Sequence, residues 1–147
     1  MISIGTQYAW NLLAVTAMSF QCSMAGLSVV AARKKFGVEY PDMGSGRFSS
    51  KLNEEQWLEF NNVMRVHQNY VEGLPIATIT TLVSGLFYPK LSAISGAVYI
   101  LGRFIYGLGY ASRGASGRLV GVFILDAGLV TNLIASLVGI YHVLSKK

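Results

Sequence analysis

The segment "RVHQNYVEGLPIATITTLVSGLFY", residues 65–88, decides how the rest of the sequence is interpreted. Its second part, residues 73–88, carries no charge, whereas its first part holds Arg65, His67, Asn69 and Glu72. A helix needs about 20 apolar residues to cross a bilayer core of ~30 Å, and residues 73–88 alone are too short for this. The pattern therefore predicts one membrane helix over about 58–88 that includes the polar cluster.

Three further apolar stretches of sufficient length flank this helix. The chain of 147 residues is 52% hydrophobic and only 13% charged, about half the charged share of a soluble domain. The sequence predicts an all-α fold, an integral membrane four-helix bundle in a single domain over 1–147. Its helices are expected at about 4–32, 58–88, 91–111 and 119–144. Residues 1–32 lack charge and a basic leader, which favours a retained first helix over a signal peptide.

The basic residues indicate an orientation rather than a nucleic-acid partner, because they are scattered and not interleaved with aromatics. Seven lie in or beside the first and third loops: Arg33, Lys34, Lys35, Arg47, Lys51, Arg113 and Arg118. Three lie on the other side: Lys90, Lys146 and Lys147. The positive-inside rule places loops one and three in the cytosol and both termini on the lumenal side. The first loop, 36–57, is polar and rich in Gly and Ser, which is typical of a mobile connection.

One face of the second helix gathers polar groups. At 100° per residue, Arg65, Asn69 and Glu72 fall within about 60° of one another, and His67 points to the opposite side. Arg65 and Glu72 are separated by about 10.5 Å along the axis, an awkward distance for a direct ion pair. Because unpaired charge at membrane depth is costly, each is expected to meet another helix or a bound ligand that carries both signs.

The third helix repeats the pattern with phenols. Tyr99, Arg103, Tyr106 and Tyr110 also lie within about 60°, and Arg118 follows two turns beyond. Two simpler explanations stay open: Arg103 pairs with Glu72 across the helix interface, or the tyrosines form an aromatic belt at the membrane surface.

Other candidates also have simple alternatives. Arg33 and Arg118 are compatible with positive-inside anchors, and His67 with a capping or interhelix hydrogen bond. Asp126, alone in the fourth helix, is expected to contact Ser, Thr or Asn of a neighbouring helix. The two histidines, His67 and His142, lack further ligands at metal-binding spacing, so no metal is predicted. No catalytic triad or phosphate-binding loop is evident, so a nucleophile would have to arrive with a substrate.

Three segments together resemble the MAPEG family, the membrane-associated proteins of eicosanoid and glutathione metabolism. They are "ARKKFGVEYP", "RVHQNYVE" and "GRFIYGLGYASRGASGR". The resemblance implies a homotrimer in the endoplasmic reticulum membrane, in contact with membrane lipid. Glutathione would be the co-substrate, bound between subunits near the cytosolic face. The second substrate would be a lipophilic electrophile or a lipid hydroperoxide. The implied activities are glutathione conjugation, leukotriene C synthesis and peroxide reduction.

The resemblance also implies roles for particular residues. The implied ligands of glutathione are Arg65, Asn69, Glu72, Tyr106 and Tyr110. Arg118 would hold the thiolate. Arg33 and His67 would reach the glutathione site of a neighbouring subunit. Two features depart from leukotriene C synthases. Gly73 stands where they have a tyrosine, and the spacing of eight from Tyr110 to Arg118 is one longer.

A rival function belongs to another class. Some members of this family are non-catalytic proteins that bind a fatty acid and present it to a partner enzyme. The feature that favours the enzyme is the complete polar set: Arg65, Asn69, Glu72, Tyr106, Tyr110 and Arg118.

Overall fold

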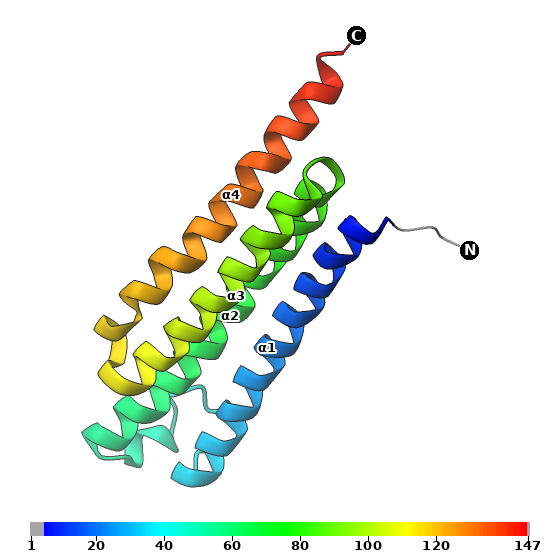
Figure 1. Ribbon diagram of the computed structural model, residues 1–147. Helices are drawn as coiled ribbons and strands as arrows, with labels where there is room; N and C mark the ends of the chain where they lie inside the picture. Colours follow the sequence, from blue (N-terminus) through cyan, green and yellow to red (C-terminus); the bar gives the residue numbers. More distant parts are fainter. Residues whose placement is uncertain (1–4, 147) are drawn as a thin grey trace.

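The computed structural model describes residues 5–146, and within them it is helical with no strand. Figure 1 shows α1 (Thr6–Phe36), α2 (Glu54–Phe87), α3 (Pro89–Arg113) and α4 (Leu119–Leu144) running side by side. Two 3₁₀ turns, η1 (Ser49–Lys51) and η2 (Gly114–Arg118), lie at the same end of the molecule. The predicted all-α class is confirmed. The expected helix start at Ile4, and Lys147, lie outside the described residues.

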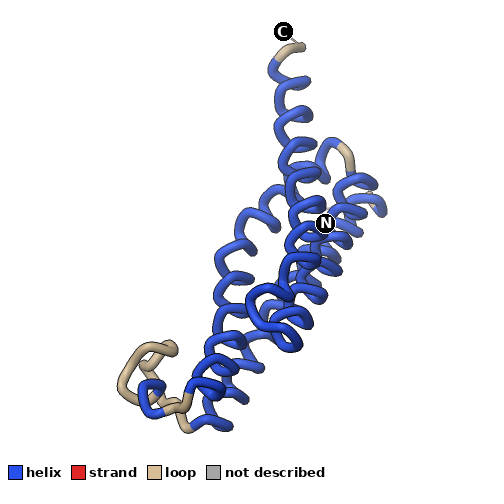
Figure 2. Tube along the Cα trace, turned by 90° about the vertical axis from the view of Figure 1, so that its left-hand side faces the viewer, coloured by secondary structure: helices blue, strands red, loops and turns tan. Residues whose placement is uncertain are grey.

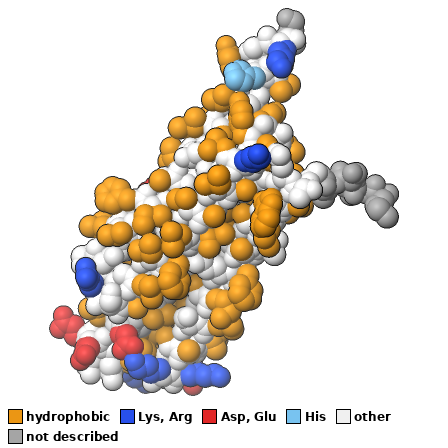
Figure 3. All heavy atoms as spheres, in the orientation of Figure 1, with side chains coloured by type: hydrophobic (Ala, Val, Ile, Leu, Met, Phe, Trp, Pro, Cys, Tyr) orange, Lys and Arg blue, Asp and Glu red, His pale blue; other side chains and the backbone are white. Residues whose placement is uncertain are grey.

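Three stretches are long and apolar enough to cross a membrane: Thr6–Phe36, Glu54–Phe87 and Pro89–Leu144, the last comprising α3, η2 and α4. Figure 3 shows hydrophobic side chains along most of the molecule. Acidic and basic side chains gather at the end with the long loop, and further basic ones lie toward the opposite end. This distribution is that of a membrane protein.

The first two helices extend further toward the loop than their apolar runs. α1 continues past the expected end at Ala32 to Phe36, because its last-turn cations suit the helix dipole and Gly37 caps it at φ 64°. α2 begins at Glu54 rather than near Leu58. Asn53 and Gln56 form a reciprocal capping box there, which satisfies backbone N–H groups at the helix start.

α3 and α4 approach each other closely because glycines face the partner backbone. A Cβ on Gly102 would collide with the backbone of Leu125, and one on Gly121 would collide with the backbone of Tyr106. Small residues let membrane helices pack at short range. In Figure 1, α1 and α4 lie on the two outer sides of the α2–α3 pair.

A buried hydrogen-bond network joins α2, α3 and α4 in the half nearer the termini. The amide of Asn132 donates to Thr81 Oγ1 at 3.0 Å, and its oxygen accepts from Ser84 Oγ at 3.0 Å. Ser92 Oγ donates to the carbonyl of Thr81 at 2.7 Å. Because these groups are buried, the network fixes the relative rotation of the three helices.

The loop between α1 and α2 is a structured unit rather than the mobile connection expected from its composition (Figure 2). The buried carboxylate of Asp42 accepts backbone N–H bonds from Gly44, Gly46, Phe48 and Ser49 at 2.7–2.9 Å, and a bond from the Ser49 hydroxyl at 3.0 Å. Burial raises the pKa of Asp42, but these hydrogen bonds outweigh it and hold the pKa well below its ordinary value. The Gly and Ser residues of this loop therefore donate backbone N–H groups to the carboxylate of Asp42.

Candidate functional site

A cavity of about 500 Å³ lies between α2, α3 and η2–α4, toward the loop end of the molecule. Its polar lining consists of Arg65, Asn69, Glu72, Arg103, Tyr106, Arg118 and Asp126, and its other lining residues are Gly73, Leu119, Val122, Leu125 and Leu129. Another hollow, of about 570 Å³, lies beside residues 5–8 and Pro89, but no charged side chain within residues 5–146 lines it. The charged cavity is therefore the candidate site.

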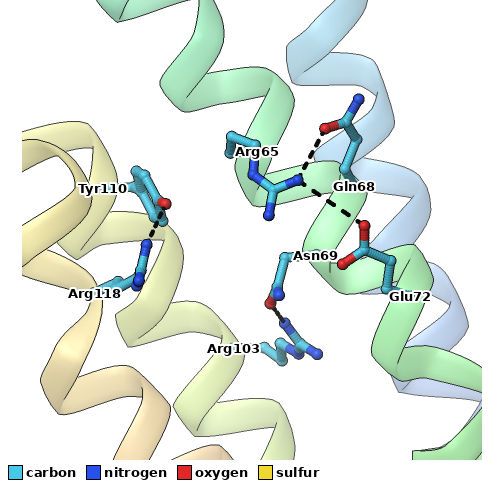
Figure 4. Close-up of polar contacts among 7 residues, drawn as sticks. All are labelled: Arg65, Gln68, Asn69, Glu72, Arg103, Tyr110 and Arg118. Carbon is cyan, nitrogen blue, oxygen red and sulfur yellow. Dashed lines mark hydrogen bonds and ion pairs between the residues drawn. The ribbon is translucent and has the colours of Figure 1, made fainter.

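On the α2 wall, Arg65 and Glu72 form a long ion pair, although their axial separation was expected to be awkward for one. Arg65 Nη1 lies 3.9 Å from Glu72 Oε1 and 3.4 Å from Gln68 Oε1 (Figure 4). Both side chains are long and bend along the helix toward each other, so they cover the axial separation. They remain 52% and 62% exposed, and such exposed pairs contribute only about 0–1 kcal/mol. Both groups are accordingly free to exchange partners with a ligand.

Arg103 does not pair with Glu72, so that alternative is wrong. Its Nη1 donates to Asn69 Oδ1 at 2.7 Å, and its Nε donates to the Tyr99 hydroxyl at 2.9 Å. The guanidinium also lies 4.7 Å from the ring centre of Tyr70. Gly73 leaves the space that Arg103 Nη2 occupies, because a Cβ at Gly73 would collide with it. Arg103 thereby cross-links α2 and α3 while facing the cavity.

The tyrosine stripe of α3 is internal, which rules out the aromatic-belt alternative. Tyr99, Tyr106 and Tyr110 are only 1–4% exposed, and Arg103 among them is 7% exposed. The rings of Tyr106 and Tyr110 lie 5.3 Å apart. The spacing of four, three and four thus marks the face of α3 that packs on its neighbours, and only Tyr106 of the three tyrosines lines the cavity.

Arg118 ends η2 and reaches back over the cavity toward α3. Its Nη1 donates to the Tyr110 hydroxyl at 2.8 Å, and its side chain is half-buried. The structure thus brings together five of the predicted site residues, Arg65, Asn69, Glu72, Tyr106 and Arg118, and ties Tyr110 to Arg118. An arginine that only anchored the loop would need no contact with the tyrosine stripe.

Arg33 and His67 do not line this cavity. Arg33 is 6% exposed beneath the first loop, where Nη1 donates to the carbonyl of Val38 at 3.2 Å and the guanidinium lies 4.1 Å from the ring centre of Tyr40. The His67 ring lies against Gly26 of α1 and is half-buried. The opposite facing of Arg65 and His67 matches the helical-wheel expectation. The role of Arg33 and His67 toward a neighbouring subunit stays a prediction.

Sequence reasoning left two cavity residues, Arg103 and Asp126, out of the site. Asp126 was expected to contact Ser, Thr or Asn, but it is exposed on the cavity wall and within residues 5–146 makes no hydrogen bond or ion pair. Asp126 follows Arg118, the residue before α4, by eight positions, which is within about 80° around a helix, a signal available from the sequence. No metal-binding group of three or more His, Cys, Asp or Glu occurs in the part of the chain that the structure describes.

Fold and site define the class: a helical membrane protein whose apolar helices enclose a cavity lined by both signs of charge. The model of the MAPEG family matches residues 11–139, so the chain belongs to the MAPEG family. It is 41% identical over 76 residues to the human protein "Microsomal glutathione S-transferase 2", a match covering 51% of this chain and 50% of that protein. It is also 30% identical over 117 residues to an uncharacterized protein of Synechocystis sp., covering 79% and 77% of the two chains.

Proposed function

We propose that the protein is a membrane-bound glutathione transferase. It conjugates the glutathione thiolate to lipophilic electrophiles and, with the same thiolate, reduces lipid hydroperoxides; leukotriene C synthesis from an allylic epoxide belongs to the same chemistry. The observation that carries the proposal is the cavity in which Arg65, Glu72 and Arg118 converge beside an aliphatic wall. The name of the human relative, matched over about half the length of each chain, supports this proposal.

The charges of the cavity complement those of glutathione. The tripeptide carries one ammonium group, two carboxylates and a thiol. Glu72 suits the γ-glutamyl ammonium, and Arg65 suits a carboxylate, which it can bind with two parallel N–H bonds. Asn69 and Tyr106 supply neutral hydrogen-bonding groups nearby, while Tyr110 holds Arg118 in place. Binding then replaces the weak, exposed Arg65–Glu72 pair by two contacts with the ligand.

Arg118 is the group we assign to the reacting sulfur. A thiol ionises near pH 8.5, and only the thiolate is a good nucleophile. Each unit by which the thiol pKa falls requires about 1.4 kcal/mol of preferential stabilisation of the thiolate. The guanidinium of Arg118 can supply this stabilisation. Its Nη1 donates to the Tyr110 hydroxyl, and its other N–H groups are available to the thiolate.

The aliphatic wall accounts for the second substrate. Leu119, Val122, Leu125 and Leu129 follow Arg118 along α4 and face the same cavity. An electrophile dissolved in the bilayer can rest on this wall while its reactive atom meets the thiolate. Holding both reactants in one cavity removes much of the entropic cost of their encounter.

We further propose a homotrimer in the endoplasmic reticulum membrane, formed by single-domain subunits with four membrane-crossing helices each. The positive-inside rule supports a cytosolic site, because Arg118, the last residue of η2, lines the cavity, and η2 lies at the same end as the first loop. In this assembly Arg33 and His67 would serve a neighbouring subunit. Within the family, the eight-residue spacing from Tyr110 to Arg118 favours the type 3 microsomal glutathione transferases.

The test is a turnover assay on detergent-purified protein with 1-chloro-2,4-dinitrobenzene and a lipid hydroperoxide side by side, each with and without glutathione. We expect glutathione-dependent product with both, and retention of the protein on a glutathione matrix. Tight binding of a fatty acid with no turnover of either substrate would overturn the proposal in favour of a protein that presents lipid to a partner enzyme.

A further inference from the structure

Asp126 is the one charged residue of α4, and the proposed contacts with glutathione leave it unused. It lies on the cavity wall with its side chain exposed. An ionisable residue inside a membrane helix is costly and is by default a sign of function. The question is therefore which group the carboxylate of Asp126 meets.

The cations of the cavity already have other partners. Arg65 contacts Glu72, Arg103 donates to Asn69 and Tyr99, and Arg118 donates to Tyr110. Within residues 5–146, no cation lies in ion-pair contact with Asp126. The carboxylate therefore remains an open acceptor for hydrogen bonds inside the cavity.

The neighbours of Asp126 place it in the part of the cavity that suits a lipid. Val122, Leu125 and Leu129 stand one turn before, directly before and one turn after it on α4, and all line the cavity. Arg118 lies eight residues away, which is about 12 Å along the helix axis. Asp126 thus lies on an aliphatic part of the cavity wall, at some distance from Arg118.

We propose that Asp126 determines substrate specificity by selecting lipophilic electrophiles that carry a hydrogen-bond donor, a hydroxyl or an amine, remote from the reacting atom. A carboxylate accepts a bond from such a donor in an apolar setting, where the bond is strong. The same negative charge repels a substrate that carries a carboxylate at that place. This inference rests on the proposed function, because it concerns the second substrate of the same cavity.

The test uses a chain-matched set of α,β-unsaturated ketones that differ at the far end: methyl, hydroxyl, amine or carboxylate. In each reaction the sulfur bonds to the β-carbon and the enolate takes up a proton, so the chemistry is constant. We expect the wild type to show a higher kcat/KM for the hydroxyl and amine compounds than for the methyl compound, and the lowest value for the carboxylate. The preference for hydroxyl over methyl should be about tenfold, as a hydrogen bond to a charged group provides.

Asp126→Leu should remove this preference and raise kcat/KM for the carboxylate compound, with little change for the methyl compound and in KM for glutathione. Asp126→Asn should raise kcat/KM for the carboxylate compound while keeping part of the preference for the hydroxyl compound. This variant tests the proposal even if Asp126→Leu does not fold. Thr131→Val is the matched control, because it removes a polar group of α4 that lies outside the cavity.

Three results would overturn the assignment. The first is a wild type with the same kcat/KM for all four compounds. The second is a ratio of kcat/KM, hydroxyl to methyl compound, that stays the same when Asp126 is replaced. The third is an equal loss on all compounds together with a changed oligomer size in detergent, which would place Asp126 in a subunit contact. A wild type that turns over none of the compounds, the methyl one included, would instead overturn the proposed function itself.

Discussion

Arg118 and Tyr110 are joined by a 2.8 Å hydrogen bond from Nη1 of the arginine to the phenolic oxygen, which links the end of η2 to α3 beside the cavity. The bond leaves the remaining N–H groups of the guanidinium available and fixes the direction in which they point. The position of the cation thus depends on a residue eight positions earlier in the chain, on a different helix.

The first prediction concerns the thiolate. Arg118→Ala should raise the pKa of the bound glutathione thiol and lower kcat by about 100-fold, as loss of one preorganised charge-stabilising donor does in other enzymes. Binding of glutathione should weaken far less. The measurements are thiolate absorbance against pH and single-turnover rates. Arg118→Lys should be intermediate, because a point charge remains while the planar fork is lost; unchanged pKa and turnover would return Arg118 to a role as a loop anchor.

The second prediction tests whether Tyr110 positions Arg118. Tyr110→Phe removes the acceptor but keeps the buried ring, so the fold should be retained. We expect kcat to fall about tenfold and the thiol pKa to rise, because the guanidinium loses the contact that orients it. The same pH titration of thiolate absorbance checks this. A fall in kcat without any change in the thiol pKa would argue for a purely structural tyrosine.

The third prediction concerns Glu72. Glu72→Gln should raise the Kd for glutathione about tenfold, the loss of a hydrogen bond to a charged group, as isothermal titration would show. The free energy of unfolding should change by less than about 1 kcal/mol, because the pair with Arg65 is exposed. Equal affinities would remove Glu72 from the ligand set, and unfolding would show that its main role is structural.

The fourth prediction exploits the space beside Gly73. In Gly73→Ala the new Cβ must displace Arg103 Nη2, the far end of a long side chain whose other guanidinium nitrogen contacts Asn69 of the proposed ligand set. We therefore expect little change in stability, since better helix propensity of up to about 1 kcal/mol offsets the displacement, but a several-fold weaker affinity for glutathione. Gly107→Ala on α3 is the control, because its Cβ would meet only Val66 at 3.7 Å. Identical glutathione affinities in the two variants would contradict the prediction.

The fifth prediction concerns pH and the first loop. The pKa of Asp42 is depressed in the folded state, so its contribution to stability is present above the unfolded pKa of about 3.9 and is lost as the pH falls below that value. Hydrogen exchange of the Gly44 and Ser49 amides should be slow and constant near neutral pH after correction for intrinsic rates, and protection should fall below about pH 4. Asp42→Asn should lose this protection at every pH; wild-type protection in that variant would contradict the assignment.

Much of the architecture is a local property of the sequence. A long uncharged run such as residues 73–88 must be helical in a membrane, because its backbone has no other hydrogen-bond partners there. Helical periodicity likewise determined that Arg65, Asn69 and Glu72 share a face and that the phenols of α3 form one stripe. These features depend on neighbours within a few residues, so the sequence alone was sufficient to predict them.

The partners of these groups were decided only by the tertiary structure. Arg103 meets Asn69 rather than Glu72, and Asp126 faces a cavity rather than a neighbouring Ser or Asn, because helix rotation and spacing depend on distant contacts. Those contacts include the close packing of α3 against α4 at their glycines and the hydrogen bond from the buried amide of Asn132 to Thr81. The order of the first loop has the same origin: five hydrogen bonds converge on Asp42 only when the backbone closes around it, and composition does not encode that closure.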